Sequence, residues 1–212
     1  MPIVLINPNS TAAMTESMVE AARAAAPGAV FEGRTSLGGP PAIQGREDGE
    51  ASVPPLLEEV RRASSDGASA IIIGCFDDTG LAEAQEIAAC PVIGIGQAAY
   101  HLAAMIGPRF SVVTTLAVSV PVLEENIVAQ GLGPSLGRVR ASGVPVLALE
   151  DAPETALPLI EAEIARAAAE DGAAAVALGC GGMATHLPRL RAAAPVPLID
   201  GVVAAAAAAA AL

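Results

Sequence analysis

The sequence predicts an α/β fold built from two similar halves, each formed around a small parallel β-sheet. Short apolar runs rich in β-branched residues alternate with Ala-rich helical stretches, which is the pattern of strand–helix–strand units with right-handed crossovers. The chain also repeats itself, because DGASAIIIGC at 66–75 returns as DGAAAVALGC at 171–180. This offset of about half the 212 residues is too long for a solenoid repeat, so it indicates two related halves.

Eight strands are predicted from short apolar runs. Continuous runs such as IIIG are typical of strands that are covered on both faces, as in parallel sheets. In chain order the predicted strands are Ile3–Asn7, Ala29–Thr35, Ala70–Gly74, Pro91–Ile95, Phe110–Thr115, Val139–Ser142, Ala174–Gly179 and Pro197–Ile199.

Helices are predicted between these strands. Pro54 and Pro55 are expected to begin one of them, since the first helical turn has no use for their missing N–H groups. A second helix is expected from about Thr155 to Asp171, with Pro158 in its first turn. The Ala-rich run Val202–Leu212 predicts a closing helix, because its eleven residues are too few for a bilayer span of ~20.

The repeat predicts where the halves divide and where they meet. We expect a first half over residues 1–96, with residues 200–212 packing back on it, and a second half over residues 97–199. A pseudo-twofold axis would then bring the carboxyl ends of both sets of strands to one shared cleft. Open α/β sheets place their ligands at such ends.

Composition narrows the class of protein and its partners. Hydrophobic residues make up 53% and charged residues 16%, which excludes a disordered chain. A net charge of −12 and 2% aromatic residues leave neither a basic surface nor stacking platforms, so we expect no nucleic-acid or membrane partner. The N-terminus resembles a strand rather than a signal peptide, and three cysteines indicate reduced thiols in the cytoplasm.

Two of the cysteines lie at equivalent places in the repeat. Cys75 and Cys180 each follow the Gly that ends a buried strand, so the pseudo-twofold axis would bring their thiols to the cleft from opposite sides. That geometry suits removal of a proton from one face of a carbon and its return to the other. A free thiol has a pKa of ~8.5, so we expect activation by backbone N–H groups at a following helix start. The N–H groups after each cysteine are candidate donors to a developing oxyanion.

Other readings of these residues remain open. A cysteine at the end of a strand can serve only to pack in the apolar core, and this is the interpretation we favour for Cys90. No CxxC, HxxxH, GxGxxG or GxxxxGK[ST] pattern is present, so we expect neither a metal nor a nucleotide cofactor. His186 is a candidate for the cleft or an isolated histidine. Asp77 and Asp78 would cap a helix, point away from the sulfur, or bind N–H groups of a substrate.

Short polar side chains follow the first strand of each half. Asn7, Asn9, Ser10 and Thr11 follow one, and Thr114 and Thr115 end the other, so both groups would reach the cleft. Ser10 and Thr11 are equally suited to capping the next helix. The Pro- and Gly-rich segment GGPPAIQG at 38–45 is predicted to be a loop at the edge of the cleft.

Four segments together resemble a known family. INPNST, GCFDDTG around Cys75, VVTT and LGCGGM around Cys180 are similar to segments of the Asp/Glu/hydantoin racemase superfamily, and within it of hydantoin and allantoin racemases. The resemblance implies two flavodoxin-like halves and a cofactor-independent isomerase, often oligomeric, with Cys75 and Cys180 as the acid/base pair. It implies substrate contacts from Asn9, the Phe76 backbone, Thr114, Thr115 and Gly181, and a side-chain pocket shaped by Ile43.

The resemblance leads to a functional hypothesis with open alternatives. We expect a homo-oligomeric racemase of 5-substituted hydantoins, with allantoin racemase as the alternative because FDDTG resembles the allantoin-type variant. Thr79 and Gly181 stand where many members have Pro and Ala. Further alternatives are a maleate isomerase, an arylmalonate decarboxylase-like enzyme, a non-catalytic small-molecule binding protein, or an aspartate/glutamate racemase. For the last, Arg46 and Arg109 are the nearest candidate partners of a dicarboxylate.

Overall fold

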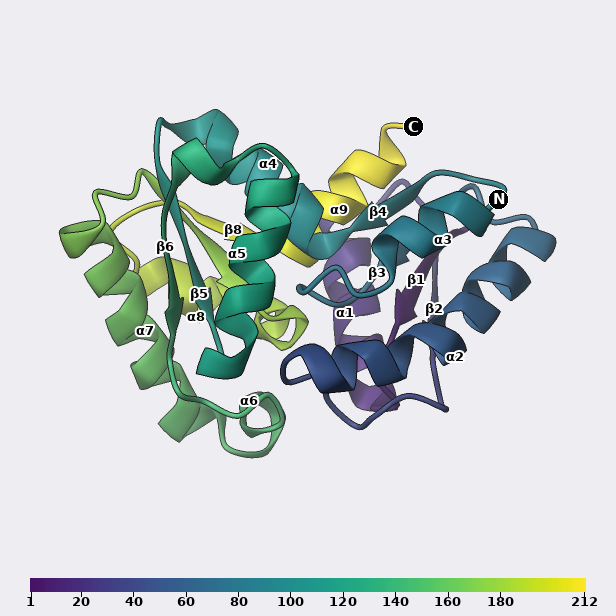
Figure 1. Ribbon diagram of the computed structural model, residues 1–212, viewed down its shortest axis with the longest axis horizontal. Coiled ribbons are helices and arrows are strands. Elements are labelled where there is room, and N and C mark those ends of the chain that lie inside the picture. The colour runs from purple at the N-terminus through teal and green to yellow at the C-terminus, as the bar shows by residue number, and fades with distance from the viewer.

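The computed structural model describes all 212 residues and contains two parallel four-stranded sheets (Figure 1). The strand order is β2-β1-β3-β4 in the first sheet and β6-β5-β7-β8 in the second. The two orders are the same once the numbering of the second sheet is shifted by four. Every strand pair is parallel. The predicted α/β class with two similar halves is therefore confirmed.

All eight predicted strands are present, with small differences at their ends. β2 begins at Phe31 rather than Ala29. β6 begins at Leu136 rather than Val139, because Leu136 already pairs with Phe110 ahead of a shift in register. The strands are β1 (Ile3–Asn7), β2 (Phe31–Thr35), β3 (Ala70–Ile73), β4 (Val92–Gly94), β5 (Phe110–Thr114), β6 (Leu136–Ala141), β7 (Ala175–Gly179) and β8 (Leu198–Asp200).

Nine α-helices and three short 3₁₀ helices connect the strands. The α-helices are α1 (Ala12–Ala25), α2 (Arg46–Ser65), α3 (Leu81–Ile87), α4 (Ile95–Ile106), α5 (Val120–Ala129), α6 (Ala148–Asp151), α7 (Pro153–Glu170), α8 (Leu187–Ala193) and α9 (Gly201–Ala210). The 3₁₀ helices are η1 (Ala117–Ser119), η2 (Gly133–Ser135) and η3 (Gly181–His186).

The prediction that Pro54 and Pro55 begin a helix is wrong, because both lie inside α2. That helix begins at Arg46, directly after Gly45, whose φ of 97° ends the preceding loop. Its acidic first turn is favourable at the positive end of the helix dipole, and the Asp48 carboxylate accepts a hydrogen bond from the Gln44 N–H. These interactions start the helix ahead of the prolines. Pro158 lies inside α7 as well, but beyond the first turn where it was predicted, because this helix begins at Pro153 rather than near Thr155.

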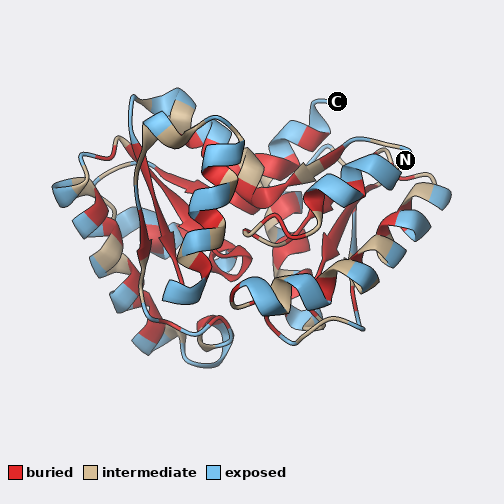
Figure 2. Cartoon of the chain, in the orientation of Figure 1, coloured by how far each residue is buried: buried red, intermediate tan, exposed pale blue.

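A layer of three helices joins the two sheets. α1, α4 and α9 lie between the sheets in Figure 1, and a single apolar core connects Leu5 and Ile72 of the first sheet with Val112 of the second. Tyr100 of α4 is fully buried there, with its ring edge-on to Phe76 at 5.2 Å. The outer faces of the sheets are covered mainly by α2 and α3 on one side and α7 on the other. Figure 2 shows both sheets buried within these layers.

The Ala-rich closing helix α9 belongs to the middle layer and contacts both α1 and α4. Its small side chains let the helices approach closely. Asp200 caps its N-terminus by accepting a hydrogen bond from the Val203 N–H at 2.9 Å. A Cβ atom on Gly201 would collide with the Ile95 carbonyl oxygen at the start of α4. None of the nine helices combines the length and the apolarity that a membrane crossing requires.

The contact between α4 and α9 predicts a sensitive glycine. Gly201→Ala is expected to lower the free energy of unfolding by about 1–3 kcal/mol, because its methyl group forces backbone apart in a packed layer. Urea unfolding followed by circular dichroism measures this. Gly28→Ala is the matched control, since no atom lies within 4 Å of its Cβ position. Equal midpoints for the two variants would contradict close packing at this site.

Candidate active site

A small cavity of about 30 Å³ lies where the carboxyl ends of the two sheets face each other. Its walls come from the ends of β3, β5 and β7, from the loops after β1 and β2, and from α1. The lining residues are Asn9, Met14, Ile43, Gly74, Cys75, Phe76, Asp77, Thr114, Thr115, Ser119, Val146, Gly179, Cys180 and Gly181.

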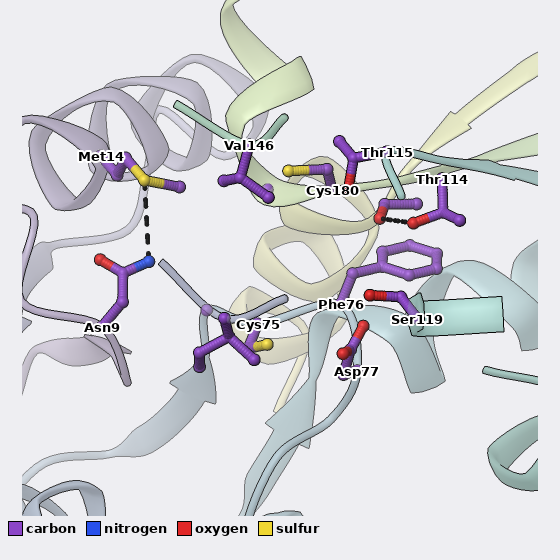
Figure 3. Close-up of a pocket in the computed structure, with 14 residues that line it drawn as sticks. Asn9, Met14, Cys75, Phe76, Asp77, Thr114, Thr115, Ser119, Val146 and Cys180 are labelled. Carbon is purple, nitrogen blue, oxygen red and sulfur yellow. Dashed lines mark hydrogen bonds between the residues drawn. The ribbon is translucent and has the colours of Figure 1, made fainter. Parts of the chain in front are cut away.

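The structure brings together the eight residues that were expected to act on or contact the substrate. They come from both halves of the chain and line this one cavity (Figure 3). Asn7, Ser10 and Thr11, which were also expected at the cleft, do not line the cavity. The loop at 38–45 reaches the cavity through Ile43, as expected for a cleft-edge loop. The eight are Asn9, Ile43, Cys75, Phe76, Thr114, Thr115, Cys180 and Gly181.

The two thiols occupy equivalent places in the duplicated fold. Cys75 follows β3 and Cys180 follows β7, and these strands hold the same position in their sheets. Figure 3 shows the two side chains on opposite sides of the cavity. Cys180 is buried and Cys75 is partly exposed, and both are free of disulfide bonds. η3 begins directly after Cys180, whereas α3 begins only at Leu81, so the helix start expected beside Cys75 is replaced by a turn.

Each sulfur receives a backbone N–H from the residue two positions later. Asp77 N–H donates to the Cys75 sulfur and Gly182 N–H to the Cys180 sulfur, and each bond favours the thiolate. The Thr79 hydroxyl lies 3.5 Å from the Cys75 sulfur. Burial outweighs these donors: it raises the pKa of Cys180 to about 12 and that of Cys75 higher still. The expected N–H donors are thus present, but both thiols are neutral near pH 7.

Two donors in the cavity remain available to a ligand. The Asn9 Oδ1 atom accepts hydrogen bonds from the Asn7 Nδ2 and the Thr11 N–H, which orients the Asn9 Nδ2 toward the cavity. That nitrogen makes only a 3.7 Å contact with the Met14 sulfur. The Phe76 N–H donates to no backbone carbonyl. Thr114 differs, since its hydroxyl donates to the Gly179 carbonyl oxygen at 2.9 Å and so helps to hold the sheet.

The two acidic residues after Cys75 have different surroundings. Asp78 is buried, and its Oδ1 accepts a hydrogen bond from the Gly96 N–H at 3.0 Å, so it caps the N-terminus of α4. Burial raises the pKa of Asp78 to about 8 and that of Asp77 to about 7. Asp77 lines the cavity, where it is the only charged residue.

Some residues of the cavity carry no signal in the sequence. Met14 and Val146 are ordinary apolar residues of a helix and a loop, and only the tertiary fold brings them to the thiols. Other candidates lie elsewhere. The His186 Nε2 pairs with the Leu149 carbonyl oxygen at 3.0 Å, outside the lining, and Arg46 forms an exposed ion pair with Glu125. Cys90 is partly buried against the apolar cluster on the outer face of the first sheet.

No group of three or more His, Cys, Asp or Glu side chains is arranged to hold a metal ion. The lining residues present two thiols, one carboxylate, hydroxyls, an amide and backbone N–H groups to the cavity.

The duplicated parallel fold, with one cavity between two equivalent thiols, points to a class of isomerases, the racemases of the Asp/Glu type. The profile of the Asp/Glu/Hydantoin racemase family matches residues 3–209. The chain belongs to this family, and it is a racemase.

Individual relatives support this assignment over nearly the whole chain. A hydantoin racemase from Rhizobium meliloti is 47% identical over 206 residues, which is 97% of this chain and 86% of the relative. The structure of allantoin racemase from Klebsiella pneumoniae superimposes with a TM-score of 0.94 at 39% identity, covering 100% of this chain and 87% of the other. Allantoin racemase from Pseudomonas fluorescens gives a TM-score of 0.95 at 36% identity, covering 100% and 90%.

The capping role of Asp78 leads to a prediction about stability and pH. Since burial raises the pKa of Asp78 to about 8, the folded protein holds this proton when the unfolded chain has lost it, and ionisation therefore costs stability as the pH rises from 5 to 8. Asp78→Asn keeps the acceptor for Gly96 and removes that cost, so it should gain stability relative to the wild type over this range.

Asp78→Ala is the matched variant that removes the cap. It is expected to lose about 1 kcal/mol of stability at pH 5 relative to Asp78→Asn, because the Gly96 N–H loses its acceptor. Urea unfolding at pH 5 and pH 8 measures both variants. A wild type and an Asp78→Asn variant with parallel stability curves would contradict the buried, protonated carboxyl.

Proposed function

We propose that this racemase acts on 5-substituted hydantoins by proton transfer between Cys75 and Cys180. The observation that carries the proposal is the pair of thiols at equivalent strand ends on opposite sides of one cavity. The similarity to hydantoin racemase from Rhizobium meliloti supports the substrate class, and the similarity to allantoin racemases supports a close variant of it.

In the proposed mechanism the hydantoin C5 lies between the two sulfurs. One cysteine, as the thiolate, removes the C5 proton, and the electron pair of the C–H bond delocalises onto the adjacent carbonyl oxygen. The Asn9 Nδ2 and the Phe76 N–H are the donors for that oxyanion, and each such donor is typically worth ~3–4 kcal/mol. The other thiol then gives its proton to the opposite face of C5. The product is the enantiomer, and the thiol and the thiolate have exchanged roles.

The electrostatics of the cavity favour a neutral ring over a dicarboxylate. No Arg lines the cavity, and its single charged group, Asp77, is an acid that would repel a second carboxylate. Arg46, one of the two cations considered for such a substrate, is paired with Glu125 at the surface. Aspartate, glutamate, maleate and arylmalonate are therefore disfavoured as substrates.

The proposal extends to the setting of the enzyme. The family resemblance supports a homo-oligomer, which analytical ultracentrifugation tests by comparing the mass in solution with the 21.0 kDa of one chain. The three free cysteines support a reducing, cytoplasmic compartment. The proposed mechanism uses no cofactor, since the proton donor and acceptor are both side chains of this chain.

Replacing either thiol tests the mechanism. Cys75→Ser and Cys180→Ser are each expected to lower kcat/KM for racemisation by about 10²–10⁴-fold, because each removes one of the two acid/base groups. Polarimetry measures racemisation, and proton NMR in deuterated water measures exchange at C5. Each variant should still exchange the C5 proton of one enantiomer.

Cys90→Ser is the control, because Cys90 lies outside the cavity and its replacement should leave activity unchanged. Racemisation at the wild-type rate by both Cys75→Ser and Cys180→Ser would refute the two-thiol mechanism.

The raised thiol pKa values predict the pH dependence of the reaction. The thiolate is the minor form at neutral pH, so its population grows as the pH rises toward the thiol pKa. We expect kcat/KM to increase continuously from pH 6 to 8.5, after subtraction of the rate in the Cys75→Ser/Cys180→Ser double variant. A plateau below pH 8 would show that a thiol ionises near neutrality, contrary to the effect of burial.

A further inference from the structure

The two halves of the site differ at one position. Asp77 and Gly182 are each two residues after a cysteine, and each directs its backbone N–H at the preceding sulfur. The second half has no side chain there, and the first half carries a carboxylate. A proton transfer between two equivalent thiols needs the two N–H groups but not the carboxylate, so the side chain of Asp77 is an addition to the symmetric site.

The Asp77 carboxylate has no partner within the protein. It takes part in none of the ion pairs of the structure, and neither of its oxygens accepts a hydrogen bond from another residue. The ion pairs involve Asp66, Glu125, Glu58, Glu59, Asp171, Glu163, Glu170, Glu154 and Glu161. Its neighbour Asp78, by contrast, is used in capping α4.

The backbone of Asp77 is nevertheless held firmly. The Asn126 Nδ2, on α5 of the second half, donates to the Asp77 carbonyl oxygen at 2.7 Å. This bond crosses between the halves and sets the position of the carboxylate in the cavity. Figure 3 shows Asp77 on the same side of the view as Ser119, with the apolar Met14 and Val146 away from it.

The Asp77 carboxylate makes ionisation of the two thiols less favourable. Its charge raises the pKa of both Cys75 and Cys180, which lowers the population of the thiolate that the reaction needs. A partly buried carboxylate without donors also loses hydration that no protein group replaces. A ligand that supplies N–H groups would replace that lost hydration.

We propose that Asp77 is a specificity-determining residue that accepts hydrogen bonds from N–H groups on the 5-substituent of the substrate. The site then prefers rings whose substituent carries such donors, as the ureido group of allantoin does, over rings with an alkyl substituent. This inference rests on the proposed function and assigns the substrate class within it. Cationic substituents with ammonium N–H groups share the same chemistry, and the experiment separates them.

The test compares the wild type with Asp77→Asn on three substrates. These are allantoin with its neutral ureido group, 5-(4-aminobutyl)hydantoin with an ammonium group, and 5-isopropylhydantoin with no donor on its substituent. A hydrogen bond to a charged acceptor is worth about a 10- to 100-fold change in affinity. We expect Asp77→Asn to lower kcat/KM for allantoin by that factor and to leave the isopropyl compound unchanged or faster.

The control is Glu83→Gln, which removes the charge of an exposed residue on α3 outside the cavity and should change none of the three rates. If Asp77→Asn lowers kcat/KM for allantoin alone, the carboxylate recognises a neutral ureido group. If kcat/KM for the aminobutyl compound falls as well, the carboxylate recognises both neutral and cationic N–H donors. Equal losses on all three substrates, or no loss on allantoin, would overturn the inference. A wild type that racemises none of them would overturn the proposed function instead.

Discussion

The burial of two sulfur atoms between two sheets is the constraint on which the rest of this structure depends. Both thiols leave the carboxyl ends of strands that are covered on each face, so water is largely removed from them and their neutral forms are favoured. The low polarity that suppresses the thiolate also makes it a stronger base once it forms. The N–H groups of Asp77 and Gly182 recover part of the lost hydration without adding a charged partner.

The two thiols face each other across the cavity only while the two sheets stay at a fixed distance. The middle layer of α1, α4 and α9 provides it, because one continuous apolar core connects both sheets. Tyr100 links this layer to the site, since its ring packs edge-on against Phe76 and its hydroxyl donates to the Phe76 carbonyl oxygen at 3.2 Å. Phe76, the residue after Cys75, is thereby fixed in the apolar core, so the packing of the middle layer also positions the site.

Duplication of the fold explains the symmetry of the site. Residues that break this symmetry indicate how the site selects its substrate. Equivalent strands deliver equivalent thiols and equivalent N–H donors, which is what transfer between the two faces of one carbon requires. Thr79 beside Cys75 and the carboxylate of Asp77 have no counterparts around Cys180. Groups that a symmetric reaction does not need are the natural candidates for recognising the rest of the substrate.

The sequence by itself determined the fold class, the eight strands, the repeat and most of the cavity residues that it named, because apolar periodicity and strand-end residues are local properties of the chain. Ile43 was indicated only by the family resemblance. The sequence misplaced the start of α2, where acidic residues and Gly45 outweigh the signal of two prolines. Only the tertiary structure decided that Met14 and Val146 reach the cavity, that His186 does not, and that burial outweighs the N–H donors at both thiols. Those outcomes depend on contacts between distant segments and on the exclusion of water, which no local pattern records.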